Sequence, residues 1–120
     1  MNEPFLQALL VGLPQSFGRE NATEPMDRPW TSGIFKNPVE GPVWLGKTNL
    51  DGDGQADQKH HGGPEKAVLA YAASHYPLWQ QEMGLTHMTY GGFGENFAIM
   101  GLTEQEVCIG DTFRIGDAIV

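Results

Sequence analysis

The residues best suited to chemistry lie together at positions 51–63, in the stretch DGDGQADQKHHGG. It holds three aspartates, two adjacent histidines and four glycines, and its only methyl side chain is Ala56. With no large apolar group to bury, it cannot build a core, and a long polar loop in a compact domain is usually functional or disordered. Glycines let a backbone approach a ligand, and histidines can donate, accept or coordinate near neutral pH. We therefore interpret it as a candidate binding loop.

Two metal-binding interpretations of this loop are weakened by its own spacing. An EF-hand calcium loop needs glycine at its sixth position and glutamate at its twelfth, and here Ala56 and Gly62 stand there. A zinc site would use His60, His61 and Asp57, with His75 as a further candidate ligand. Adjacent residues of an extended chain point to opposite sides, so His60 and His61 rarely bind one ion together. Neither an H-E-x-x-H helix nor a paired-cysteine motif is present. We predict no metal-ligating residue in this sequence and keep zinc as a less favoured alternative.

Two further polar groups extend the candidate site. Gly62 and Gly63, followed by Lys66, could cradle an anion with backbone N–H groups and an ammonium group. A tight turn explains the two glycines equally well. Glu95 and Asn96 open an apolar strand, where they could bind a heterocycle or orient a water molecule. They could equally well hydrogen-bond nearby turn amides, and the sequence leaves these alternatives open.

Charge and cysteine usage limit the classes of partner and compartment. The 120 residues carry a formal net charge of −8, which makes duplex DNA or an anionic membrane surface a poor partner. The only cysteine is Cys108, so no internal disulfide can form, which fits a reducing cytosol. Because Cys108 lies between Val107 and Ile109, we predict that it is a small buried hydrophobic residue. No signal peptide is apparent, and no apolar run approaches the roughly 20 residues that span a bilayer. We expect a cytoplasmic protein.

The elements that must position these residues are mostly β-strands. Sixteen glycines and eight prolines favour a fold with many turns over a helical bundle. Pro77 in the first turn, Ser74 as N-cap and Gly84 as C-cap predict a helix over 75–83. Single turns or loops are expected at 14–32, 85–94 and 102–106. The predicted strands are 5–11, 31–36, 42–48, 66–71, 97–100, a five-residue hairpin strand over 111–115 and a last strand that begins at 118.

The ordered set of motifs resembles the MOSC-domain family, in its YiiM type. Any one of these motifs is weak alone, but their order and spacing cover nearly the whole chain. They are 30–36 (WTSGIFK), 41–46 (GPVWLG), 51–57 (DGDGQAD), 60–63 (HHGG), 66–71 (KAVLAY), 75–76 (HY), 93–96 (FGEN) and 109–111 (IGD). The resemblance implies a pyruvate-kinase-like β-barrel with a few short helices, and a single MOSC domain over residues 1–120.

The resemblance also implies a cofactor, a reaction and partners. The cofactor is the molybdenum cofactor, a pterin, and the reaction is reduction of N-hydroxylated compounds such as N-hydroxylated purines and amidoximes. A separate flavin-type reductase supplies the electrons, and a homodimer is a further expectation. By the same analogy His61 and Glu95 are the candidates for proton handling. The residues expected at the cofactor are Asp53, Gln55, Gly62, Gly63, Lys66 and Asn96.

One departure from the family pattern bears on activity. The family's molybdenum ligand is a cysteine on a Ser-Gln-Pro-Arg-x-Pro-Cys segment, which would follow the strand that begins near Asp117. This sequence stops at Val120, and Cys108 lies too early to replace that cysteine. We therefore expect a barrel truncated on its C-terminal side and a 120-residue chain that is inactive alone. The alternative function is a non-catalytic module that binds a small anion or carries the cofactor or its sulfur.

Overall fold

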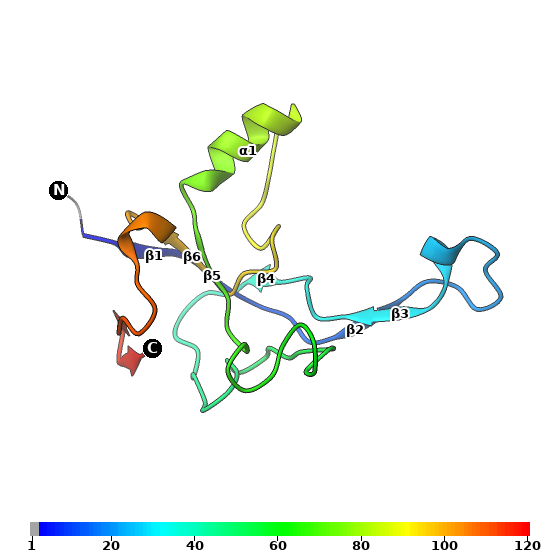
Figure 1. Cartoon of the computed structure of the whole chain (residues 1–120), viewed down its shortest axis with the longest axis horizontal. Helices are drawn as coiled ribbons and strands as arrows, with labels where there is room; N and C mark the ends of the chain where they lie inside the picture. The colour runs from blue at the N-terminus through cyan, green and yellow to red at the C-terminus, as the bar shows by residue number, and fades with distance from the viewer. Residues whose placement is uncertain (1–2) are drawn as a thin grey trace.

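A computed structural model describes residues 3–120 and shows a mostly β chain with one α-helix (Figure 1). The predicted β-rich class is therefore confirmed. Its elements are β1 (Phe5–Val11), β2 (Gln15–Phe17), the 3-10 turn η1 (Pro25–Asp27), β3 (Trp30–Ser32), β4 (Asn37–Pro38), β5 (Ala70–Ala72), α1 (His75–Met83), β6 (Phe97–Met100), the 3-10 turn η2 (Glu104–Glu106), β7 (Arg114–Ile115) and β8 (Ala118–Ile119).

A four-stranded sheet in the order β4-β1-β6-β5 forms the centre of the molecule. Strand β1 pairs antiparallel with β4 and β6, and β5 runs parallel to β6. The small core lies on this sheet, where Leu10, Ala73 and Ala98 are fully buried beneath Tyr90 and Met100. Among residues 3–120 the sheet does not close into a barrel, in keeping with the prediction of an incomplete one.

Short-range signals placed three elements well. Strands β1 and β6 match the apolar runs predicted at 5–11 and 97–100, and α1 matches the helix predicted over 75–83. Gly84 ends the helix in the left-handed region, with φ 65°, and its N–H bonds the carbonyls of the last turn. Ser74 was expected to cap the first turn, but its side chain makes no capping hydrogen bond and its backbone is already helical.

The segment predicted as a loop over 14–32 is instead a projecting hairpin, which we call the arm (residues 15–32). Strands β2 and β3 pair from Gln15↔Ser32 to Phe17↔Trp30, and η1 lies toward the far end. Figure 1 shows the arm reaching away from the sheet. Local sequence does not predict these two strands, because the tip between them is polar and the paired residues are 13 to 17 positions apart. The predicted strand over 31–36 is correspondingly only the end of β3.

Three other predicted strands are shorter or missing, because strands persist only where a partner backbone is within reach. The predicted strand over 42–48 is replaced by an isolated bridge between Leu45 and Leu50. Over 66–71, the chain first turns, with the Lys66 N–H bonded to the Gly63 carbonyl, and pairs only from Ala70. The five-residue strand of the last hairpin reduces to β7 opposite β8. No helix in the described residues is long and apolar enough to cross a membrane.

Candidate functional site

The candidate loop faces the sheet across a cavity of 590 Å³, which we call the polar cavity. It lies where the base of the arm, the 51–63 loop and the start of β6 meet. Its lining residues are Trp30, Thr31, Ser32, Gly33, Ile34, Lys36, Gly54, Gln55, Ala56, Asp57, His61, Lys66, Ala67, Leu69, Phe93, Gly94 and Asn96. Of the predicted site residues, Gln55, His61, Lys66 and Asn96 are gathered here. The other predicted site residues do not line the cavity but support its walls from outside: Asp53, Gly62, Gly63 and Glu95.

A buried ion pair fixes the base of the loop. The Lys36 ammonium lies 2.6 Å from Asp53 Oδ1, and the two side chains are only 7% and 1% exposed. Lys36 also donates to the carbonyls of Gly12 and Gly54, at 3.3 and 3.4 Å, and the Gly12 N–H donates to Asp53 Oδ1 at 3.0 Å. Asp53 is thus engaged inside the protein, and its expected cofactor contact stays a prediction.

The Gln55 side chain closes the loop on itself. Its Oε1 accepts from the Gly63 N–H, and its Nε2 donates to the Gly63 carbonyl at 3.4 Å and to Asn49 Oδ1 at 3.2 Å. A Cβ atom at Gly62 would collide with Gln55 Oε1 and with the Asp57 carbonyl. The absence of a side chain at Gly62 therefore allows the backbone to approach Gln55 closely. The hydrogen bonds between Gln55 and Gly63, which we call the loop clip, join the chain on either side of His61.

Glu95 is fully buried and holds the loop that precedes β6. Its Oε2 accepts a hydrogen bond from the Tyr76 hydroxyl, and its Oε1 accepts one from the Phe93 N–H at 3.1 Å. Tyr76 in turn accepts from the Gly92 N–H at 3.1 Å. Burial and the neighbouring Glu95 carboxylate raise the pKa of Tyr76 well above its usual range. Because Glu95 does not line the cavity, its proton-handling role stays a prediction that would require this network to open.

Asn96 joins the sheet to the cavity. Its amide nitrogen donates to the Leu10 carbonyl at 3.0 Å, and its side-chain oxygen accepts from the Leu69 N–H at 3.0 Å. Its backbone bonds the same two residues, at 2.8 Å each. Both polar atoms of the Asn96 side chain are therefore bonded to backbone groups, one in β1 and one just before β5. These bonds fix the register of the sheet at the cavity wall.

His61 and Lys66 are the cavity side chains best placed to meet a ligand. Within the described residues neither side chain forms an ion pair, and Lys66 is exposed. Asp57 lies beside them and accepts from the N–H groups of His60 and Lys59, at 2.9 and 3.0 Å. The His60 hydrogen bond is the main cause that lowers the pKa of Asp57. The cavity thus offers a cation, an imidazole and an anionic carboxylate.

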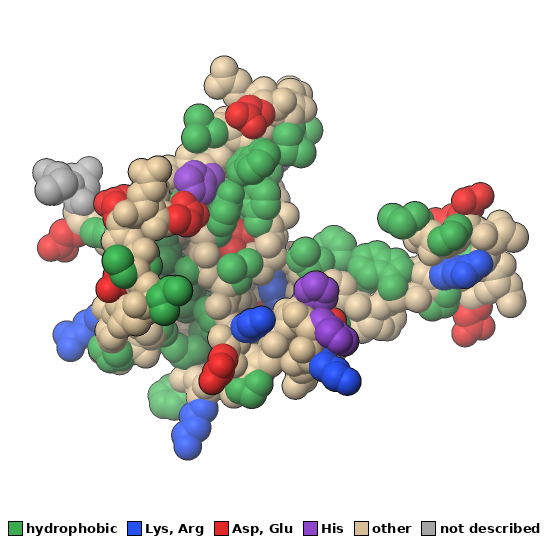
Figure 2. Space-filling model, in the orientation of Figure 1, with side chains coloured by type: hydrophobic (Ala, Val, Ile, Leu, Met, Phe, Trp, Pro, Cys, Tyr) green, Lys and Arg blue, Asp and Glu red, His purple; other side chains and the backbone are tan. Residues whose placement is uncertain are grey.

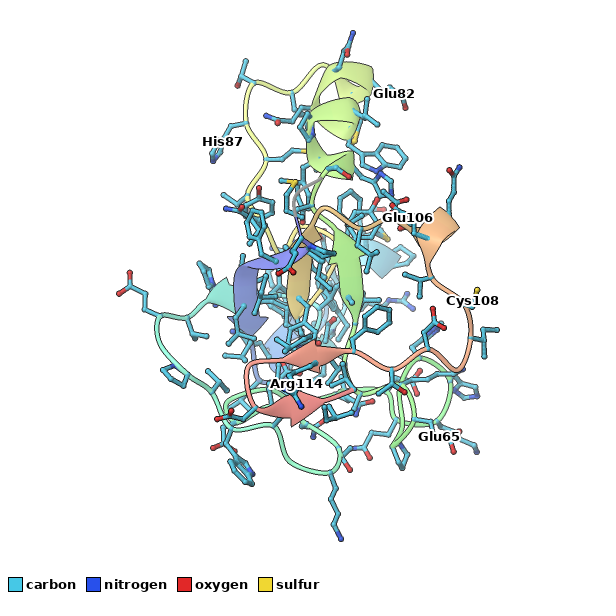
Figure 3. All side chains as sticks on the ribbon, turned by 90° about the vertical axis from the view of Figure 1, so that its left-hand side faces the viewer. Glu65, Glu82, His87, Glu106, Cys108 and Arg114 are labelled. Carbon is cyan, nitrogen blue, oxygen red and sulfur yellow. The ribbon has the colours of Figure 1, made fainter. Side chains whose placement is uncertain are left out.

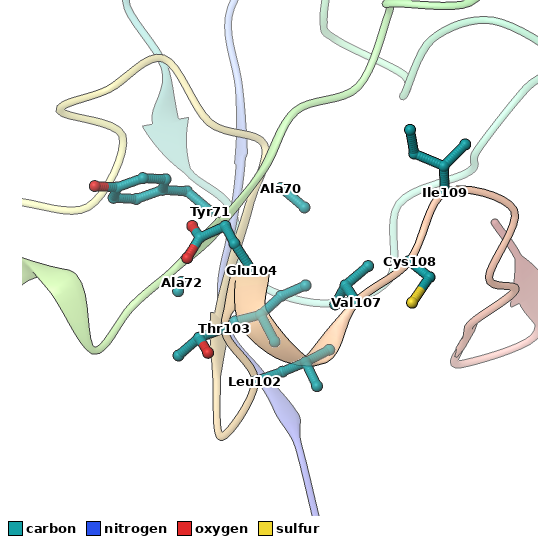
Figure 4. A pocket seen from close by; sticks show the side chains of 10 residues that line it. Ala70, Tyr71, Ala72, Leu102, Thr103, Glu104, Val107, Cys108 and Ile109 are labelled. Carbon is teal, nitrogen blue, oxygen red and sulfur yellow. The ribbon is translucent and has the colours of Figure 1, made fainter.

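In the part of the chain that the structure describes, no cysteine lines the polar cavity. The sequence predicts a buried Cys108, but its side chain is exposed, because the chain between η2 and β7 runs along the outside of the molecule (Figure 3). It borders a different, mostly apolar cavity of 320 Å³, with Leu102, Val107 and Ile109 (Figure 4). Among residues 3–120, no group of three or more His, Cys, Asp or Glu side chains could hold a metal ion.

Two lining residues, Lys36 and Phe93, have no role at the site that the sequence predicts. Lysine is seldom buried without a charged partner, so a lysine after Ile34-Phe35 does not by itself indicate a buried position. Phe93 carries no local signal either, because its side chain reaches the cavity only through the fold.

Comparison with solved structures places this β-rich fold with the YiiM proteins. The crystal structure of YiiM from Geobacillus stearothermophilus superposes with a TM-score of 0.67 at 32% sequence identity, over 98% of this chain and 48% of that one. The family model of the MOSC domain matches residues 57–120. The chain therefore belongs to the MOSC domain family, as the ordered motifs predicted.

Curated relatives extend this result. The uncharacterized protein YflK of Bacillus subtilis (strain 168) is 43% identical over 108 residues, which cover 90% of this chain and 48% of YflK. A protein of Gibberella moniliformis described as a reductase is 38% identical over 92 residues, or 75% of this chain and 16% of that protein. The chain thus spans about half of YflK and far less of the reductase. The MOSC family is associated with the molybdenum cofactor, and these relatives include a reductase.

Proposed function

We propose that this chain provides the cofactor- and substrate-facing wall of a molybdenum-cofactor oxidoreductase that reduces N-hydroxylated compounds, such as N-hydroxylated purines. The observation that carries the proposal is the polar cavity, which brings His61 and Lys66 together beside the start of β6 in a MOSC-family chain. Membership of the family and a reductase among the relatives support the reaction class.

The cavity suits the organic part of the cofactor. A volume of 590 Å³ lies within the roughly 300–1,000 Å³ typical of small-molecule sites. The Lys66 ammonium can pair with a phosphate group, and Phe93 offers an apolar surface. The donor set does not suit the metal itself, because no cysteine of residues 3–120 lines the cavity. We therefore assign the metal's sulfur ligand to a cysteine outside this part of the chain.

The reaction requires protons as well as electrons. Conversion of R–NHOH to R–NH₂ and H₂O consumes two electrons and two protons, and a separate flavin-type reductase would deliver the electrons. When bound, the cofactor would supply the two-electron reduction of the N–O bond. Within this chain, His61 would hold and donate a proton at a ring nitrogen, since histidine is the side chain most suited to proton transfer near neutral pH. Lys66 would bind the anionic phosphate group of the cofactor.

Cofactor capture tests the proposal. The chain is purified from cells that synthesise the cofactor, and bound pterin is measured by fluorescence after oxidation, with molybdenum measured by mass spectrometry. We expect pterin with the unmodified chain and with Lys47→Glu, whose site is exposed and outside the cavity, and much less with Lys66→Glu. Absence of pterin both from this chain and from a longer protein that contains it would refute the proposal.

Turnover tests the assignment of the metal ligand and separates the two functions. With 6-hydroxylaminopurine and a reduced dye, we expect no turnover by the 120-residue chain and turnover by a longer protein that contains it. Cofactor-dependent turnover by the short chain would show that its own residues complete the metal site. Pterin binding without turnover by the longer protein would favour the non-catalytic binding or carrier module.

A further inference from the structure

Three aromatic rings form a ledge at the base of the arm, which we call the aromatic ledge (Phe17, Trp30 and Phe35). Phe17 and Trp30 are paired across β2 and β3, with ring centroids 4.6 Å apart and planes inclined by 27°, which is a stacked arrangement. Phe35 packs against them with centroids 4.9 Å from Phe17 and 6.3 Å from Trp30. The indole of Trp30 is thus supported on one side by its neighbours.

The aromatic ledge is not buried, although three packed aromatic rings are large enough to form a hydrophobic core. Trp30 keeps 43% of its surface exposed, and it lines the polar cavity together with Thr31 and Ser32. Hydrophobic side chains gather at the base of the arm in Figure 2, beside a group of histidines. The backbone under the indole is held by the Ser16–Thr31 hydroxyl pair, at 3.1 Å, and by the Ile34 N–H donated to Ser32 Oγ, at 3.1 Å.

We propose that Trp30 is a specificity-determining residue, whose indole is the wall on which the planar ring of a substrate stacks. This inference rests on the proposed function, because it takes the polar cavity as the substrate site. Aromatic rings prefer offset stacking, and a side chain that is already held by Phe17 loses little conformational entropy when a ligand binds. The site therefore favours an N-hydroxyl group carried on a planar heterocycle over one carried on an aliphatic chain.

The polar side chains of the cavity do not distinguish a heterocyclic substrate from an aliphatic one, so the preference depends on the indole ring of Trp30. His61 and Lys66, which line the cavity, would contact polar parts of a substrate such as the N-hydroxyl group, which aliphatic and heterocyclic substrates share. An aliphatic group lacks the flat face that an indole can cover. Stacking of a base on an aromatic side chain is worth about 1–3 kcal/mol, or roughly 5- to 150-fold in affinity. Because Trp30 offers only part of its surface, we expect the lower end, about 5- to 10-fold.

Binding measurements with two probes test the inference without turnover. Calorimetry is performed with 6-hydroxylaminopurine and with acetamidoxime on the unmodified chain, Trp30→Leu, Trp30→Phe and the control Trp44→Leu, whose side chain is exposed outside the cavity. We expect the purine to bind more tightly than acetamidoxime. Trp30→Leu should weaken purine binding about 5- to 10-fold and leave acetamidoxime unchanged, whereas Trp30→Phe and Trp44→Leu should have little effect.

A spectroscopic readout removes the dependence on stable variants. The purine should shift the NMR signal of the Trp30 indole N–H by its ring current and leave that of Trp44 in place. The inference is overturned if the purine does not bind, if it binds without shifting the Trp30 signal, or if folded Trp30→Leu binds it with unchanged affinity. These outcomes are independent of pterin capture, so failure of the specificity assignment is distinguishable from failure of the proposed function.

Discussion

Replacing Lys36 with methionine is expected to cost this chain about 3–5 kcal/mol of unfolding free energy. Methionine keeps the length of the buried stem and removes the charge that lies 2.6 Å from Asp53 Oδ1. Within the described residues, the Asp53 carboxylate then keeps only the Gly12 N–H as a donor. Its Oδ2 already has no hydrogen-bond partner among residues 3–120, and its side chain is 1% exposed, so solvent cannot replace the lost ammonium.

The magnitude follows from burial. Removing one partner of a buried pair leaves an uncompensated charge, and a domain of this kind has only about 5–15 kcal/mol of total stability. With a urea dependence near 2 kcal/mol per molar, the unfolding midpoint would fall by about 2 M. The double variant Lys36→Met/Asp53→Leu removes both charges and should recover most of the loss, because an apolar replacement of a buried pair is often close to neutral.

Urea unfolding, followed by tryptophan fluorescence and circular dichroism, measures these differences. An exposed pair gives the control: Arg19 and Asp27 are 3.5 Å apart with side chains 78% and 51% exposed, so Arg19→Met should cost less than about 1 kcal/mol. The reasoning is refuted if Lys36→Met is within about 1 kcal/mol of the unmodified chain, or if the double variant shows the simple sum of the two single losses.

Other contacts give three further predictions. Tyr76→Phe removes a donor to Glu95 and should cost about 1–3 kcal/mol in urea unfolding at pH 7. Because the pKa of Tyr76 is raised on folding, the stability it contributes is present below about pH 10 and is lost as the pH rises further. An equal alkaline loss in Tyr76→Phe would contradict this. Gly62→Ala should lower the urea midpoint by forcing the loop clip open, and an unchanged midpoint would show that the loop relaxes freely. A hydrogen bond with His75 lowers the pKa of Glu104, so its stabilising effect is lost as the pH falls, and His75→Ala should raise that pKa in an NMR titration; an unchanged titration would count against the contact.

Local sequence determined the elements that depend on neighbours along the chain. The apolar runs of β1 and β6 and the helix α1, ended by Gly84, follow from side-chain type and backbone preference over a few residues. The polar loop at 51–63 was recognisable because it contains nothing that a core could use. Family membership was also readable from the order of the motifs, and the MOSC match over residues 57–120 confirms it.

Only the tertiary structure decided which of the candidate residues share a site. Lys36 is paired with Asp53 across 17 residues, and Asn96 bonds the Leu10 carbonyl across 86, so neither contact has a local signature. The arm forms because β2 and β3 pair with each other, and this pairing brings Trp30 to the cavity. Sequence gives the chemical types and the local elements, whereas burial and long-range hydrogen bonding decide that Glu95 and Asp53 are held inside while His61 and Lys66 face the cavity.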